Sequence, residues 1–232
     1  MCGRYTLSES PAEIADAFDD VLGVDCSTEF SATYDWQPRY NIAPSQYCLV
    51  AACVGSAPEL ALMRWGLIPH WAKDQKIANK LINARAETVA EKPSFRTAFR
   101  HKRCLVFASG YYEWTKRDGQ KYPVHITSTQ ANVIAFAGLW SSWSGDDTDT
   151  LNTFTIITTS ANADIDSVHH RMPVTLTPSD AQLWLSRTPD QADSLALLRP
   201  APDGTFSHCF VSNYVNAPRN EGPECVQAIS AP

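Results

Sequence analysis

The run RCLVFAS at residues 103–109, followed by GYYEW at 110–114, is the stretch that best predicts how this chain folds. A short, nearly continuous apolar run is typical of a buried β-strand. Comparable runs recur at 47–53, 60–66, 122–126, 132–139, 153–159 and 206–212. Helical patterns are inserted among them at 74–82, 86–91, 93–100, 178–186 and 190–199. Strands in succession, without strict alternation with helices, predict an α+β fold with a mainly antiparallel, barrel-like β-sheet core and several peripheral helices.

The first helix has the clearest boundary signal in the sequence. Ser10 can cap it, Pro11 suits its first turn, and Glu13 completes a capping box. The apolar residues that follow share one helical face: Ile14, Phe18 and Val21. A polar and poorly patterned connection then runs through Thr33.

The rest of the chain indicates one continuous domain. Thr177, followed by Pro178 and Asp180, predicts a second capped helix start. The segment SGDDTDTL at 144–151 is predicted to be an exposed hairpin loop. Since neither an internal repeat nor a linker is evident, we expect a single domain over residues 1–232.

Composition narrows the class of protein. With 232 residues, 44% of them apolar, the chain can bury a substantial core. The start MCGRYTLSES has no run typical of a signal peptide, and no later stretch approaches the ~20 apolar residues of a membrane span. We therefore expect a soluble, cytoplasmic monomer without membrane partners.

The cysteines predict neither disulfides nor a metal site. There are seven, scattered along the chain without a CxxC pair or a Cys/His cluster at zinc spacing. Cys104 and Cys209 lie in apolar runs and are expected to be core residues. The sequence has no signature of a metal or other cofactor, and none is predicted.

Positive charge is concentrated in one part of an acidic chain. Residues 64–104 hold ten Lys or Arg against three Asp or Glu, about +7, whereas the whole chain carries −6. This segment is either a solvated basic face or a groove that binds phosphates. The charge pattern alone leaves both readings open.

Cys2 is the first candidate for chemistry. After a small second residue, removal of Met1 is expected, which would leave an amine and a thiol on adjacent carbons. Such a terminus can capture an aldehyde twice, first as an imine and then as a thiazolidine ring. At pH 7 an α-amine of pKa about 7.8 holds roughly 400-fold more free base than a lysine of pKa about 10.4. Arg4 is expected to favour the thiolate. The plain alternative is an unremarkable cysteine near a frayed terminus.

Several motifs in register carry a resemblance to a known family. After MCGRY at 1–5 come PRYNIAP at 38–44, RWGLIPHW at 64–71, INARAET at 82–88, RCLVFASGYYEW at 103–114, HHRMPV at 169–174 and NYVNAPRNEGPE at 213–224. Together these resemble the SOS-response-associated peptidases, or abasic-site processing proteins, over essentially the whole chain. Two positions depart from the family pattern. Phe107 stands where proline is usual, and His170 where an acidic or amide residue usually separates the histidine from Arg171.

The resemblance implies a covalent trap for abasic sites in single-stranded DNA. By this likeness Cys2 is the nucleophile, Asn83 holds the amine and the sugar, and Glu113 moves protons during imine formation. His169, two positions before Arg171, assists opening of the sugar ring. Each has a structural alternative: a salt-bridged strand residue for Glu113, a loop residue for either histidine, and a helix-end cap for Asn83.

The resemblance also implies the residues that bind DNA. Arg4, Arg85 and Arg171 would bind phosphates, since a guanidinium suits bidentate phosphate contacts. Trp71 would lie against the kinked strand, because an aromatic face can stack a base without reading sequence. The alternative for Trp71 is a core position, which is also expected for three other tryptophans: Trp65, Trp114 and Trp140.

Two other functions compete with this reading. An N-terminal-nucleophile thiol hydrolase would also use Cys2, but it needs an oxyanion hole and an amide-substrate site that the sequence does not specify. Its peptidase variant, in which the protein removes its own Met1, stays open. A noncatalytic single-stranded DNA-binding module would bind without any covalent product.

Overall fold

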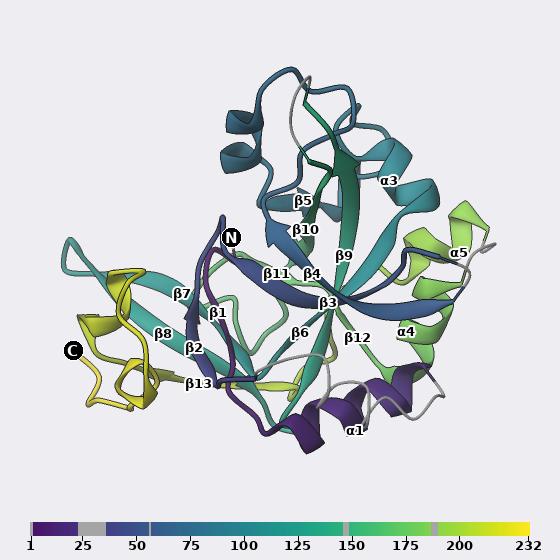
Figure 1. The fold of residues 1–232 in the computed structure, drawn as a ribbon. Helices are drawn as coiled ribbons and strands as arrows, with labels where there is room; N and C mark the ends of the chain where they lie inside the picture. The colour runs from purple at the N-terminus through teal and green to yellow at the C-terminus, as the bar shows by residue number, and fades with distance from the viewer. Residues whose placement is uncertain (1, 23–35, 56, 146–148, 187–189) are drawn as a thin grey trace.

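Five strands close on one another as a barrel at the centre of the molecule (Figure 1). The circuit runs from strand to strand through β10 (Leu151–Ser160), β4 (Pro58–Trp65), β3 (Tyr47–Cys53), β6 (Arg103–Ala108) and β9 (Ile134–Trp143), and β9 pairs again with β10. Only the β10–β4 pair of this circuit is parallel. This computed structural model describes residues 2–22, 36–55, 57–145, 149–186 and 190–232. The predicted α+β fold with a mainly antiparallel, barrel-like core is confirmed.

Three short strands extend the barrel sheet and bring distant segments to β10 and β9. β5 (Asn83–Arg85) pairs in parallel with β10, and β11 (Arg171–Pro173) pairs antiparallel with the end of β10. β12 (Thr175–Leu176) pairs with β9. β10 therefore places β5 and β11 next to its own carboxyl-terminal half.

A second, antiparallel sheet packs beside the barrel. Its order is β13 (Phe206–Phe210), β8 (Gln120–Ser128), β7 (Gly110–Arg117), β1 (Tyr5–Leu7) and β2 (Arg39–Ile42). The central pairing sets Tyr5 opposite Tyr111 on one side and Ile42 on the other. Because Cys2 precedes β1 by only a few residues, this pairing holds the amino end of the chain between the two sheets.

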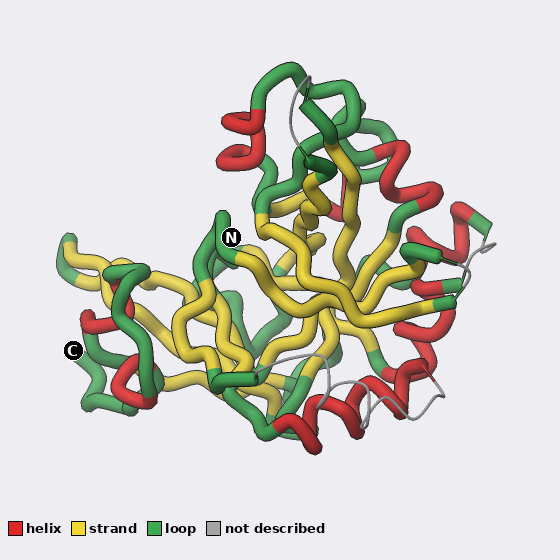
Figure 2. Tube along the Cα trace, in the orientation of Figure 1, coloured by secondary structure: helices red, strands yellow, loops and turns green. Residues whose placement is uncertain are grey.

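The helices lie at the periphery, as Figure 2 shows. They are α1 (Pro11–Leu22), α3 (Arg96–His101), α4 (Pro178–Leu185) and α5 (Gln191–Ala196), with short 3₁₀ helices at Gln75–Lys80, Ala86–Thr88, Asn213–Asn216 and Pro223–Cys225. The predicted capping box is confirmed: the amide of Ser10 donates to the Glu13 carboxylate, and the amide of Glu13 donates to the Ser10 hydroxyl. The hydroxyl of Thr177 likewise accepts the amide of Asp180.

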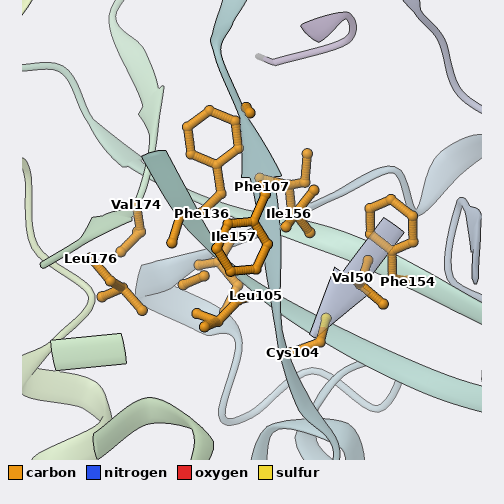
Figure 3. Close-up of a cluster of buried hydrophobic side chains, with 14 of the residues drawn as sticks. Val50, Cys104, Leu105, Phe107, Phe136, Phe154, Ile156, Ile157, Val174 and Leu176 are labelled. Atoms are coloured by element: carbon orange, nitrogen blue, oxygen red, sulfur yellow. The ribbon is translucent and has the colours of Figure 1, made fainter. Parts of the chain in front are cut away.

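Apolar side chains from the barrel strands fill the core, shown in close-up in Figure 3. Phe107, where the family usually has proline, is buried and packs on Phe18 of α1 with ring centroids 3.9 Å apart. Cys104, Trp65 and Trp140 are buried as expected. Two expectations are wrong. Trp114 and Cys209 are only half-buried, and they pack at the margin of a small separate cluster of buried residues that includes Tyr112 and Val215.

The main errors of the sequence prediction lie between residues 74 and 91. The helices expected at 74–82 and 86–91 are 3₁₀ helices at Gln75–Lys80 and Ala86–Thr88, separated by β5. The strands β1, β2, β5, β7, β11 and β12 were not predicted. Most of them are too short to show an apolar period, and they exist because a neighbouring strand satisfies their backbone hydrogen bonds.

Two predicted connections have different outcomes. Trp143 pairs with Leu151 across the hairpin predicted at 144–151, which confirms a turn there, although 146–148 lie outside the described residues. Most of the connection through Thr33 also lies outside them. In the parts of the chain that are described, no helix is long and apolar enough to cross a membrane.

Candidate active site

Cys2 is buried and held by a residue far along the sequence. Its backbone carbonyl accepts a 2.7 Å hydrogen bond from Nδ2 of Asn83. Its Sγ lies 3.9 Å from the carbonyl oxygen of Arg4. Asn83 begins β5 and pairs with Ile156 of β10, so the barrel itself brings Asn83 to the amino end of the chain.

The Asn83 side chain still has an unused acceptor. Its Oδ1 is buried and has no hydrogen-bond partner within the described residues. The alternative reading, in which Asn83 caps the end of a helix, is wrong, because Asn83 lies in a strand and the preceding 3₁₀ helix ends at Lys80. An amide with one oxygen free beside Cys2 can accept a hydrogen bond from an amine.

Glu113 and His169 form the second half of the site. Glu113 is 3% exposed on β7, and its Oε1 lies 4.0 Å from Nδ1 of His169. Burial raises the pKa of Glu113, and the positive amino terminus of the chain opposes that rise. Burial lowers the pKa of His169, and the amino terminus lowers it further. The charge of the amino terminus therefore acts on both Glu113 and His169.

The two neighbouring histidines occupy different positions. His169 is half-buried beside Glu113, whereas His170 is exposed and stacks on His169 with ring centroids 4.4 Å apart. Nδ1 of His169 lies 3.0 Å from the backbone nitrogen of Arg171. The same Nδ1 lies 3.2 Å from the carbonyl oxygen of Arg171, so the tautomer decides which of the two contacts is a hydrogen bond, and Nε2 takes part in neither.

Arg4 is directed into the protein. Its Nη1 donates to Oδ1 of Asn41 at 2.6 Å and to the carbonyl of Val215 at 2.8 Å, and the residue is 8% exposed. The expectation that Arg4 would favour a Cys2 thiolate is wrong. Burial, reinforced by the charge of Glu113, instead raises the pKa of the Cys2 thiol.

Arg171 is engaged by an acidic partner. Its Nη2 donates to Oε2 of Glu87 at 3.0 Å, its Nη1 donates to Oε1 of the same carboxylate, and Nη2 also donates to the carbonyl of Thr158. The pKa of Glu87 is lowered because its carboxylate accepts hydrogen bonds from Arg171. Only 9% of Arg171 is exposed, and the carboxylate of Glu87 supplies the opposite charge beside it.

Most of the basic segment 64–104 does face solvent. Its exposed members are Lys73, Lys76, Lys80, Arg85, Lys92, Arg96 and Arg100. Arg103 is buried, and its guanidinium donates to backbone carbonyls of α3 and of the end of α4. Arg85 ends β5 two residues after Asn83, which sets an exposed guanidinium next to the Cys2 site.

Trp71 lies on the same basic surface. It is 50% exposed, so the alternative of a core position is wrong. Trp71 borders a surface hollow of about 340 Å³ that is also lined by Ala72, Asp74, Ile77 and three lysines: Lys73, Lys76 and Lys80. An aromatic face among ammonium groups is suited to a base and its phosphate.

Two residues that hold the arginines of this region have no individual role that could be assigned from the sequence. Glu87 lies within INARAET and Asn41 within PRYNIAP, so both stood in quoted motifs without an assigned role. Their partners, Arg171 and Arg4, follow only from the tertiary structure. No group of three or more His, Cys, Asp or Glu side chains is arranged to hold a metal ion in the described ranges.

Comparisons with known proteins agree with the sequence motifs. The model of the family described as SOS response associated peptidase (SRAP) matches residues 1–218. Abasic site processing protein YoqW of Bacillus subtilis (strain 168) is 41% identical over 98% of this chain and 100% of its own. Abasic site processing protein HMCES of Gallus gallus is 32% identical over 99% of this chain and 78% of its own. A solved structure from Bacteroides thetaiotaomicron superposes with a TM-score of 0.83 at 28% identity, over 98% of this chain and 100% of that one. The chain belongs to the SOS response associated peptidase family.

Proposed function

We propose that this protein senses abasic sites in single-stranded DNA and traps them as a thiazolidine crosslink through the amine and thiol of Cys2. The observation that carries the proposal is the convergence of Asn83, Glu113 and His169 on the amino end of the chain. Relatives that match nearly the whole chain are named abasic site processing proteins, which supports the same substrate.

The reaction is a condensation that releases one water molecule and needs no oxidant. Opening of the deoxyribose ring moves a proton to the ring oxygen and exposes the C1′ aldehyde. The Cys2 amine adds to C1′, and loss of water gives the imine. The thiol sulfur then bonds to the same carbon while the nitrogen takes up a proton. A free amine is required, so Met1 must be removed first; Met1 lies outside the described residues.

The side chains around Cys2 have chemistry that suits these steps. The imidazole of His169 can carry the proton that the ring oxygen takes up. Glu113, whose pKa is raised above that of an ordinary carboxyl group by burial, can both give and take a proton, as general acid–base catalysis requires. Asn83 can hold the amine through its unused Oδ1. The raised thiol pKa suits an order in which the amine attacks first.

We further propose that Trp71, Arg85, Arg171 and Arg4 contact the strand. Trp71 and Arg85 are both exposed, and Arg85 ends the strand that Asn83 begins, which supports direct contact. Arg171 and Arg4 have internal partners and would reach a phosphate only with the guanidinium edge that those partners leave. A binding surface of this kind would recognise backbone and lesion with little sequence preference.

Denaturing electrophoresis with an abasic oligonucleotide tests the proposal. Wild-type protein should form a product that survives denaturation, Cys2→Ala should form none, and Cys2→Ser should give at best a labile imine. A stable product from Cys2→Ala would refute the mechanism. Stable binding without any covalent product would instead favour a noncatalytic DNA-binding module.

The peptidase of the family description is compatible with removal of Met1 by the protein itself. Intact-mass analysis of Glu113→Gln and Cys2→Ala would show whether Met1 persists when the site is disabled. Protein that uniformly retains Met1 should not crosslink, because its Cys2 nitrogen is then a secondary amide.

A further inference from the structure

Asn41 is a buried polar residue that the proposed reaction does not use. It lies on β2 and is fully buried. Its Oδ1 accepts Nη1 of Arg4 at 2.6 Å. Its Nδ2 lies within hydrogen-bond distance of three backbone carbonyls, at 3.2 Å from Val215, 3.1 Å from Ala217 and 2.7 Å from Asn220. One side chain thus joins β1, β2 and the carboxyl-terminal segment, which we define as residues 213–225.

The carboxyl-terminal segment has a second attachment, beside Glu113. Nε1 of Trp114 donates to Oδ1 of Asn216 at 2.7 Å, and Trp114 directly follows Glu113 on β7. The guanidinium of Arg4 lies over the Trp114 ring, 5.8 Å from its centroid. The segment therefore contacts the neighbours of two of the proposed reacting groups.

The attachment at Arg4 leads directly to Cys2. The carbonyl of Arg4 accepts the amide of Tyr112 at 2.9 Å, which fixes its backbone on β7, and Sγ of Cys2 points at the same oxygen. One residue separates Arg4 from Cys2. Since the side chain and the backbone of Arg4 are both held, the direction in which the chain leaves β1 is fixed.

Burial of polar groups lowers the stability of the fold unless they are hydrogen-bonded, and both polar atoms of the Asn41 side chain have partners. Asn41 also has no exposed surface from which to contact DNA. We propose that Asn41 is a positioning residue, which locks β1 to the carboxyl-terminal segment so that the amine and thiol of Cys2 meet Glu113 and His169. This inference rests on the proposed function.

The consequence is a loss of rate rather than of affinity. A reacting group misplaced by about 1 Å can lose about 10²-fold in rate even when the change lies away from the chemistry. Asn41→Leu removes both arms of the network, and Asn41→Asp keeps an acceptor for Arg4 but loses the donors to the segment. We expect Asn41→Leu to lower the maximal single-turnover crosslinking rate by about 10- to 100-fold. Asn41→Asp should fall between Asn41→Leu and wild type.

The experiment measures crosslinking of an abasic single-stranded oligonucleotide against protein concentration and against salt. The loss of rate should persist at saturating protein and low salt, where any change in the contact between Arg4 and DNA no longer limits the reaction. A defect that disappears at saturating protein, where the maximal rate returns to the wild-type value, would show that Asn41 acts on DNA binding and would overturn the inference. A wild-type rate in Asn41→Leu would overturn it as well.

Two further variants keep the test informative if Asn41→Leu folds poorly. Glu221 is exposed, and its carboxylate accepts the amide of Tyr40 and contacts Arg39, so Glu221→Ala loosens the segment from β2 without disturbing the core. It should lower the same maximal rate to a smaller extent, and an unchanged rate would contradict the inference.

Arg103→Gln is the matched control for general destabilisation. Arg103 is 8% exposed like Arg4 and lies over a tryptophan ring, but its hydrogen bonds go to α3 and the end of α4. Its maximal crosslinking rate should match wild type in folded protein, and an equal loss there would overturn the inference. If wild-type protein forms no crosslink at all, the proposed function fails and the inference falls with it.

Discussion

The side-chain amide of Asn83 donates a hydrogen bond to the backbone carbonyl of Cys2, 2.7 Å away and 81 positions earlier in the chain. This bond ties Cys2, which carries the proposed nucleophiles, to β5, a strand that pairs with the barrel strand β10. It leaves Oδ1 of Asn83 buried and available to an amine. Chain ends are usually poorly ordered unless other parts of the fold hold them, and here the hydrogen bond from Asn83 holds Cys2.

Asn83→Asp should slow crosslinking more than it weakens binding. A carboxylate cannot donate to the Cys2 carbonyl, so the terminus loses its anchor while the strand stays intact. We expect the single-turnover rate to fall by about 10- to 100-fold. Asn79→Asp, at an exposed position of the preceding 3₁₀ helix, should behave as wild type. A wild-type rate for Asn83→Asp would show that the anchor is dispensable.

His169 and Glu113 should be separable by substrate. His169→Ala should slow capture of an abasic site, whose sugar is mostly a closed ring, much more than capture of a simple open-chain aldehyde. His170→Ala is the matched control, since His170 is exposed. Single-turnover rates should differ by about 10²–10⁴-fold between His169→Ala and wild type on the abasic substrate. A larger defect in His170→Ala would show that His170, and not His169, assists ring opening.

Glu113→Gln should slow both substrates and change the pH dependence of the rate. Burial raises the pKa of Glu113, so its limb in the pH–rate profile should lie above the usual range of a carboxyl group. Glutamine cannot titrate, and the limb should therefore disappear in that variant. Its persistence in Glu113→Gln would assign the limb to another group.

Arg85 and Arg171 should contribute unequally to the salt dependence of binding to single-stranded DNA. Each phosphate contact contributes about 0.7 to the slope of log K against log salt. Arg85→Gln should remove one such contribution, because Arg85 is exposed. Arg171→Gln should remove less, because Glu87 already balances that charge. Equal effects in binding titrations would mean that Glu87 releases Arg171 when DNA binds.

The folded protein should lose stability in mild acid because of His125. Burial lowers its pKa from about 6.5 to about 4, so the folded state resists a proton that the unfolded chain accepts. Its contribution is fully present above pH 6.5 and is lost as the pH falls towards 4, by about 3 kcal/mol in total. Denaturant unfolding at several pH values should show this loss flattened in His125→Gln. His208→Gln, at an exposed position of β13, should keep the wild-type dependence.

The sequence by itself determined the parts of this protein that local chemistry specifies. The long apolar strands, the capped starts of α1 and α4 and the concentration of basic residues could be read from periodicity, cap residues and charge count. The reactivity of an amino-terminal cysteine could be predicted in the same way, because an amine and a thiol on adjacent carbons need no fold. The motifs in register pointed to Asn83, Glu113 and His169 and to the family.

Tertiary structure alone decided how those parts meet. Residues 83–85 were expected only to connect two helices, and they form the strand β5 because β10 offers them backbone hydrogen bonds. The same pairing carries Asn83 to Cys2. From the sequence, Arg4 and Arg171 were expected to be available to phosphates. In the structure Arg4 is held by Asn41 and Arg171 by Glu87, and each partner is distant in sequence. Long-range pairing of short strands leaves almost no local pattern, since its free energy comes from groups supplied by another part of the chain.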